Sequence, residues 1–356
     1  MKALYEGKRI AGIYTVVPDN RIPFEEEAAN YAAPVEQTLR LKKVMGFGAH
    51  RIVREASCAS DMAVAGLEDM ISRGLLDPNE VSALLFVSQT PDAPMPPTSN
   101  LIQGRLGLPT SVFCLDINQG CAGFIVGAML GFSLLDNPDC KTVVLINADT
   151  LSRKCSPQDR NIYPMVGDAA AITLLKRSDD DARIWARMNM DGSRAKALQI
   201  PAGGLRMPSS AATREVNDIG DGNRRSLDHF YMEGSEVFNF VVSEVPGLIE
   251  QLLEDSGVAK DDIEYFLFHQ PNKFMLQKLG SQAGLAKERL FTNIVEEFGN
   301  ASSATIPTNI CHNLRDVVTE RPAKVMLAGF GVGLSWGGLV LDLGKLDFCE
   351  LHEMSF

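Results

Sequence analysis

The chain has 356 residues, 45% of them hydrophobic and 22% charged, and its formal net charge is −11 at pH 7. This length and composition are typical of a soluble globular protein with a sizeable core. The acidic balance, without any basic run, argues against binding to nucleic acid or to an anionic membrane surface. No apolar run reaches the roughly 18 residues that a membrane-spanning helix needs.

The N-terminus and the cysteines indicate the compartment. Residues 1–20 contain no continuous apolar segment and no small-residue cleavage site, so we expect no signal peptide. The seven cysteines are scattered without a C-x-x-C pair, so neither a zinc site nor a redox dithiol is indicated. An odd number of cysteines without a secretion signal fits reduced thiols, and we expect a cytoplasmic protein without a metal.

The first half of the chain predicts alternating strands and helices. Buried-type strands are expected at residues 9–17, 81–87, 112–117, 141–147 and 169–175. Helical patterns cover residues 25–45, where Pro34 breaks the helix, 60–73 and 99–106. A Pro-rich loop precedes the last of these helices, because Pro94, Pro96 and Pro97 force an extended backbone.

The second half has a similar element order. We expect strands at residues 263–268, 290–294, 324–328 and 334–343, and a glycine turn at 329–333. Helices are predicted at residues 232–256, 272–283 and 302–313. The common order predicts two βα-layered halves, residues 1–181 and 182–356, around a pseudo-twofold axis, with a site where helix N-termini meet.

Cys121 lies in the stretch DINQGCAGFIVGAML, residues 116–130. A strand precedes it, and an apolar segment typical of a buried helix follows it. Cys121 would therefore lie at or near a helix N-terminus, where unpaired N–H groups and the helix dipole favour a thiolate. The residue alone equally fits a small buried hydrophobe, as most free cysteines are.

Two polar residues and a glycine-rich segment accompany this cysteine. His269 follows the strand of residues 263–268, a position where α/β proteins build sites, although a buried structural imidazole fits as well. Asn300 precedes a run of small residues that opens a helix, and an ordinary N-cap is its simpler reading. The glycines of residues 329–338 allow a tight turn or a backbone N–H that faces an oxyanion.

The order and spacing of eight motifs resemble the β-ketoacyl-acyl-carrier-protein synthase III family of the thiolase-like superfamily. They are TPD at 90–92, CAGF at 121–124, DR at 159–160, GDAAA at 167–171, MEGSEVFNF at 232–240, HQPN at 269–272, GNASSATIP at 299–307 and GFGVGLSWG at 329–337. The resemblance implies an α/β fold with duplicated βαβαβαββ halves in a five-layered α-β-α-β-α sandwich.

The resemblance also implies a Cys-His-Asn triad. Cys121 would take an acyl group from a thioester, and the backbone N–H groups of Cys121, Val332 and Gly333 would form the oxyanion hole. His269 Nε2 and the Asn300 amide would bind the carbonyl of a malonyl thioester and stabilise the enolate formed as CO2 leaves. The carbanion then attacks the acyl group on the cysteine.

The coenzyme A tunnel of the family matches less well. Arg160 and Asn272 stand where the family contacts phosphate and pantetheine, and Phe330 is expected among the substrate-binding residues. Arg40 and Val44 occupy positions where the family usually carries Trp and Arg. The donor is therefore either an acyl-CoA or an acyl carrier protein, and both are substrates, since no bound cofactor is implied.

Two further positions concern partners. Phe274 replaces the family's carrier-docking Arg, although Lys273 lies beside it. The acyl pocket of the family is gated across a homodimer, and Met95 occupies that position; its flexible side chain can admit groups larger than acetyl, or it can serve only as interface packing.

Three functions follow from these residues. The first is decarboxylative condensation by a homodimeric synthase III in fatty acid or specialised biosynthesis. The second is transfer of the acyl group from Cys121 to an alcohol or amine without decarboxylation. The third is a non-catalytic partner in a heterodimeric synthase, against which the intact Cys121, His269 and Asn300 argue.

Overall fold

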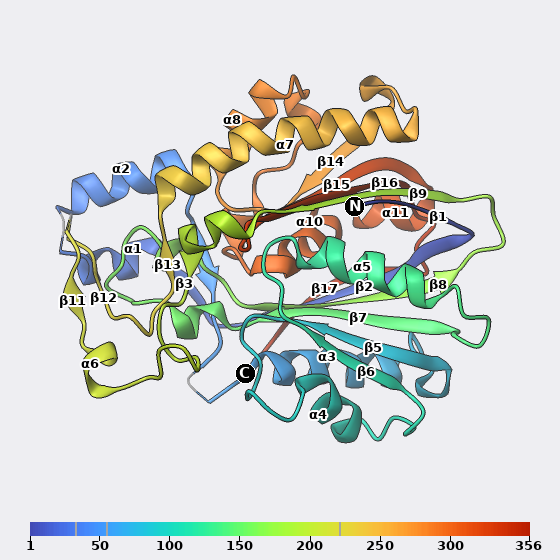
Figure 1. Cartoon of the computed structure of the whole chain (residues 1–356), viewed down its shortest axis with the longest axis horizontal. Coiled ribbons are helices and arrows are strands. Elements are labelled where there is room, and N and C mark those ends of the chain that lie inside the picture. Colours follow the sequence, from blue (N-terminus) through green and yellow to red (C-terminus); the bar gives the residue numbers. More distant parts are fainter. Residues whose placement is uncertain (33, 55, 221) are drawn as a thin grey trace.

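The computed structural model describes residues 1–32, 34–54, 56–220 and 222–356. Figure 1 shows five layers, which confirm the predicted α-β-α-β-α sandwich. The outer helices are α7 (Gly234–Ser256) and α8 (Lys273–Gln282) on one face and α3 (Ala59–Ser72) and α4 (Thr98–Arg105) on the other. The middle layer holds α5 (Gly123–Leu134) and α10 (Thr305–Asn313).

Two mixed sheets separate the helical layers. One sheet has the order β17-β2-β8-β7-β5-β6, with the bounds Phe348–Met354, Lys8–Pro18, Ala169–Arg177, Thr142–Asp149, Val81–Val87 and Phe113–Ile117. The other has the order β1-β9-β16-β15-β14, with the bounds Lys2–Glu6, Arg183–Met190, Ser335–Leu343, Ala323–Gly331 and Tyr265–Phe268. The boundary proposed at residue 181 falls between β8 and β9, but each sheet contains one strand from the opposite half, because β1 pairs with β9 and β17 with β2.

Smaller elements surround the end of the sandwich where the site lies. They are β3 (Arg21–Pro23), α1 (Phe24–Glu27), α2 (Val35–Met45), β4 (Ala49–Arg51), β10 (Leu198–Gln199), α6 (Ala211–Arg214), β11 (Asn217–Asp218), β12 (Arg224–Arg225), β13 (Tyr231–Met232) and α9 (Ile294–Glu297). The short helix α11 (Arg315–Glu320) lies at the opposite end, before β15 (Figure 1). Within the described ranges, no helix combines the length and the apolar character that crossing a membrane requires.

The central helix α5 is apolar on all sides because both sheets pack against it. Phe124, Ile125 and Phe132 are fully buried there. Gly127 permits the close approach of β7, since a Cβ at this position would lie 2.5 Å from Leu145 Cδ1. The all-round apolar pattern therefore predicts the place of α5 correctly.

The structure corrects three expectations about secondary structure. Residues 290–294 form no strand: Leu290 makes a single bridge to Phe266, and α9 begins at Ile294. Residues 329–331 continue β15 instead of turning, and Gly329 is needed because a Cβ would lie 2.8 Å from the Ala122 Cα. The predicted strand of residues 334–343 is followed by a further strand, β17, that was not predicted. Its half-polar sequence FCELHEM is typical of a strand at a sheet edge and lacks the apolar run of a central strand.

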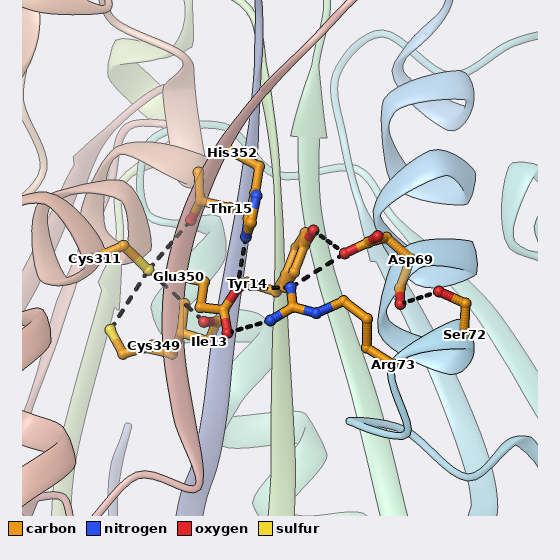
Figure 2. A network of polar contacts seen from close by, with 10 residues as sticks. All are labelled: Ile13, Tyr14, Thr15, Asp69, Ser72, Arg73, Cys311, Cys349, Glu350 and His352. Carbon is orange, nitrogen blue, oxygen red and sulfur yellow. Dashed lines mark hydrogen bonds and ion pairs between the residues drawn. The ribbon is translucent and has the colours of Figure 1, made fainter.

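Side chains on both sides hold β17 in place (Figure 2). Arg73 of α3 donates to both carboxylate oxygens of Glu350, at 2.7 and 2.8 Å. The buried Tyr14 of β2 donates to Asp69 at 2.5 Å, and its ring stacks on His352 with centroids 4.6 Å apart. The C-terminal strand is therefore bound to both β2 and α3.

Candidate active site

Cys121, His269 and Asn300 line one narrow cavity with a free volume of about 60 Å³. Cys121 directly precedes the N-terminus of α5, His269 follows the end of β14, and Asn300 lies between α9 and α10. The structure thus brings together three residues from three distant segments. Apolar side chains form most of the remaining wall, namely Leu151, Ile162, Met165, Val166, Leu198, Phe230, Met232, Val237, Val241, Met275, Phe330 and Val332.

The surroundings of Cys121 stabilise the neutral thiol. Burial, followed by the negative charge of Asp149, raises the pKa of Cys121 to about 12. The Ser302 hydroxyl and the backbone N–H groups of Val332 and Cys121 lower this pKa, but they do not outweigh the loss of solvation. Burial of the sulfur therefore opposes the thiolate that the helix N-terminus favours, and ionisation of Cys121 stays a prediction.

Backbone groups approach the sulfur from β15 as well. A Cβ on Gly331 would lie 2.9 Å from Cys121 Sγ, so only glycine leaves room for the sulfur. The Val332 N–H lies close enough to lower the pKa of Cys121. Val332 lines the cavity, whereas Gly333 is not among its lining residues.

His269 is buried and neutral. Burial lowers its pKa to about 3. Nδ1 lies 2.8 Å from Thr305 Oγ1, and the Thr305 hydroxyl donates in turn to the Ser302 carbonyl at 2.8 Å. Because the Thr305 hydrogen is used there, the ring proton belongs on Nδ1 and Nε2 is left as an acceptor. This differs from the expected Nε2 donor, which requires the ring proton to move to Nε2 and the Thr305 hydroxyl to donate to Nδ1.

Asn300 is fixed by its backbone and by its side-chain oxygen. Its N–H donates to the Met165 carbonyl at 2.6 Å, and its own carbonyl accepts from Gly167 N at 3.2 Å. Oδ1 accepts from Ser302 N at 2.9 Å. The amide NH2 therefore remains as the donor end of the side chain toward the cavity.

Sequence reasoning missed Asp149 and Thr305. Asp149 ends β7 and is fully buried; its Oδ1 accepts from Ser88 Oγ, Gln89 N and Thr90 Oγ1 at 2.8 to 3.0 Å. Burial raises the pKa of Asp149 to about 6. The sequence signal for Asp149 is a carboxylate at the end of the mostly apolar strand TVVLINAD.

Most of the proposed substrate-binding residues lie outside the cavity. Phe330 lines it and meets the His269 ring edge-on, with centroids 5.7 Å apart. Asn272 is buried and caps α8, since its Oδ1 accepts from Met275 N at 2.8 Å. Arg40 is exposed on α2, and Met95 is 81% exposed on its loop. Arg160 also does not line the cavity; its backbone N–H donates to Asn223 Oδ1.

Comparison with known proteins identifies the family. Residues 115–192 match the family model described as 3-oxoacyl-(acyl-carrier-protein) synthase III, and residues 253–343 match the model of its C-terminal part. A Campylobacter jejuni protein that carries the name 3-oxoacyl-(acyl-carrier-protein) synthase 3 is 30% identical over 347 residues, which cover 97% of each chain.

Solved structures agree with this assignment. The crystal structure of a 3-oxoacyl-(acyl-carrier protein) synthase from Burkholderia xenovorans has a TM-score of 0.91 and 34% identity, with 99% of each chain covered. A second structure, of a 3-oxoacyl-(acyl-carrier-protein) synthase III, has a TM-score of 0.86 and 29% identity, and covers 94% of this chain and 99% of its own. The chain therefore belongs to the 3-oxoacyl-acyl-carrier-protein synthase III family.

Proposed function

We propose that the protein transfers an acyl group from an acyl-CoA or acyl-carrier thioester to Cys121 and then condenses it with a malonyl thioester, with loss of CO2. The observation that carries the proposal is the convergence of Cys121, His269 and Asn300 on one apolar cavity. The nucleophile, a base and an amide donor are the groups that both half-reactions need.

In the first half-reaction, His269 acts as the base. Its Nε2 accepts the thiol proton as Cys121 Sγ attacks the thioester carbonyl. The N–H groups of Cys121 and Val332, which already lower the pKa of the sulfur, then stabilise the oxyanion. The intermediate collapses to acyl-Cys121 and a thiolate, which takes the proton from His269 as it leaves, so that the ring is neutral again.

In the second half-reaction, His269 acts as a neutral hydrogen-bond donor, in keeping with its low pKa. With the ring proton on Nε2 and the Thr305 hydroxyl turned to donate to Nδ1, the ring can donate to the carbonyl oxygen of the malonyl thioester beside the Asn300 amide. Loss of CO2 leaves an enolate whose charge these two donors stabilise, and its carbon attacks the acyl carbonyl. Collapse releases the β-ketoacyl thioester and Cys121 thiolate, which takes a proton from water.

We also propose a homodimer formed through β6. This strand is the outermost of its sheet, and Phe113 at its start is 51% exposed. An unpaired strand edge favours pairing with a second copy, which would bring the exposed Met95 near the neighbouring subunit. Light scattering after gel filtration tests this: the wild type should be dimeric and a Phe113→Asp variant monomeric.

A second candidate is acyl transfer to an alcohol or amine. The unprotonated Nε2 of His269 supports it, because this nitrogen can also deprotonate an acceptor hydroxyl or ammonium group. In this reaction no malonyl thioester is consumed and no CO2 is released.

Intact mass spectrometry separates these functions. The protein is incubated with acyl-CoA and acyl-carrier thioesters, and the mass added to Cys121 is measured; malonyl thioester or an alcohol is then supplied, and CO2 and products are followed. Acylation with CO2 release supports condensation, whereas acylation with transfer only to the alcohol supports the second candidate. If no donor acylates the protein, both enzymatic functions are excluded, and the role of a non-catalytic partner remains. Cys121→Ala must abolish the label.

A further inference from the structure

A buried His–Glu pair lies just behind the cavity wall. His50 on β4 and Glu27 at the end of α1 are 2% and 5% exposed. His50 Nε2 lies 3.1 Å from Glu27 Oε1, and Nδ1 lies 2.6 Å from the carbonyl oxygen of Val166. Val166 lines the cavity, whereas neither member of the pair does.

Both ring nitrogens of His50 face oxygen atoms. The Val166 carbonyl can only accept a hydrogen bond, so Nδ1 must carry a proton. Nε2 and Glu27 Oε1 then share a further proton, either as imidazolium and carboxylate or as neutral ring and carboxylic acid. A protonated ring makes its hydrogen bonds shorter and stronger than a neutral ring does, in keeping with the 2.6 Å between Nδ1 and the Val166 carbonyl oxygen; the contact with Glu27 has the ordinary length of 3.1 Å.

The charges around His50 favour the protonated form of its imidazole ring. Burial lowers the pKa of His50, but the hydrogen bond and charge of Glu27, the Val166 carbonyl and the charge of Asp168 outweigh it and raise the pKa above its usual value. The Tyr163 ring also packs edge-on against the His50 ring, with 5.3 Å between the ring centroids.

The segment around Val166, whose carbonyl contacts His50, also forms hydrogen bonds with Asn300. Val166 and Asn300 form a parallel bridge, in which Asn300 N donates to Met165 O at 2.6 Å and Gly167 N donates to Asn300 O at 3.2 Å. The segments of Val166 and Asn300 pack closely at this bridge, since a Cβ on Gly167 would lie 2.1 Å from the Phe298 carbonyl oxygen. A shift of Val166 must therefore move Asn300.

We propose that His50 and Glu27 are a positioning pair that locks the Val166 segment and thereby aims the Asn300 amide into the cavity. The inference rests on the proposed function, in which Asn300 serves the condensation and Cys121 the acylation. Cys121 is carried by the turn before α5, which receives no hydrogen bond from residues 165–167 among the described parts of the chain. The pair therefore acts on condensation and not on acylation.

The experiment measures the two half-reactions separately in His50→Gln and Glu27→Gln. Acylation of Cys121 is followed by intact mass, and condensation by CO2 release from the acylated enzyme. Condensation should fall about 10- to 100-fold, as displacement of a catalytic group by about 1 Å does, while acylation stays within about twofold of wild type. The matched control is His352→Gln, which removes a surface His–Glu contact on β17 and should leave both steps unchanged (Figure 2).

Two further measurements exclude a merely structural effect. In an Asn300→Ala background, His50→Gln should cause no additional loss, because the group that it positions is gone. In Glu27→Gln, which lacks the carboxylate that holds the second proton on His50, a rise in pH through the lowered His50 pKa replaces the charge-assisted Nδ1 bond to the Val166 carbonyl by a weaker neutral one. Condensation should therefore fall over this pH range, while acylation shows no such new step.

Unchanged condensation in both variants, an equal loss of both half-reactions, or additive losses with Asn300→Ala would overturn the positioning role. If His50→Gln fails to fold, the isosteric Glu27→Gln and its pH profile decide alone. Failure of the proposed function looks different, since the wild type itself would then release no CO2.

Discussion

The negative charge of Asp149, at the end of β7, opposes ionisation of Cys121. Asp149 Oδ2 is buried and has no hydrogen-bond partner among the described residues. The Ser302 hydroxyl lies within reach of both groups, since it lowers the pKa of each. In the reaction proposed above, Cys121 therefore starts as a thiol, and its attack requires a base.

Asp149→Asn should make Cys121 more reactive in the empty enzyme. Removing the charge lowers the pKa of the sulfur from about 12. At a fixed pH below that pKa, each unit of decrease raises the thiolate fraction about tenfold. The pH dependence of Cys121 alkylation by iodoacetamide, read by intact mass, should shift to lower pH, and an unshifted profile would show that the carboxylate does not act on the sulfur.

Thr305→Val should slow acylation of Cys121. The Thr305 hydroxyl accepts from His269 Nδ1 at 2.8 Å and so keeps the lone pair on Nε2. Loss of this orientation should cost about 10- to 100-fold in the acylation rate. Thr305→Ser, which retains the hydroxyl, should recover most of the rate; equal rates in the two variants would remove Thr305 from the proton transfer.

Gly331→Ala should block acylation while the protein still folds. The added methyl group would lie 2.8 Å from Cys121 Cβ and 2.9 Å from its Sγ, closer than carbon and sulfur tolerate. Gly204→Ala is the matched control, because a Cβ there meets no atom within 4 Å. Mass spectrometry after incubation with acyl-CoA should show label in the control only; full labelling of Gly331→Ala contradicts the crowding.

Tyr14→Phe should lower the free energy of unfolding by about 1.5–3 kcal/mol, the range for a hydrogen bond to a charged partner. The variant keeps the ring that stacks on His352 but loses the bond from the Tyr14 hydroxyl to Asp69. Urea denaturation measures the change. Ser72→Ala, which removes an exposed bond to the Asp69 carbonyl, should change little, and a similar loss in both variants would argue against the buried bond (Figure 2).

The sequence by itself determined the layers and the three central residues of the site. The apolar strands and the all-round apolar helix α5 follow from local periodicity, because burial on two sides requires it. Cys121 and Asn300 each stand among glycine or small residues, His269 follows an apolar strand, and the resemblance of those motifs assigned the roles.

Only the tertiary structure decided the protonation of the site and what supports it. The proton on His269 Nδ1 depends on Thr305, which is 36 residues away in the chain. The pKa of Cys121 depends on burial and on a carboxylate from another strand, and Asn300 depends on the Val166 segment that His50 holds. Such effects depend on distances across the folded core, and residue patterns along the chain do not contain these distances.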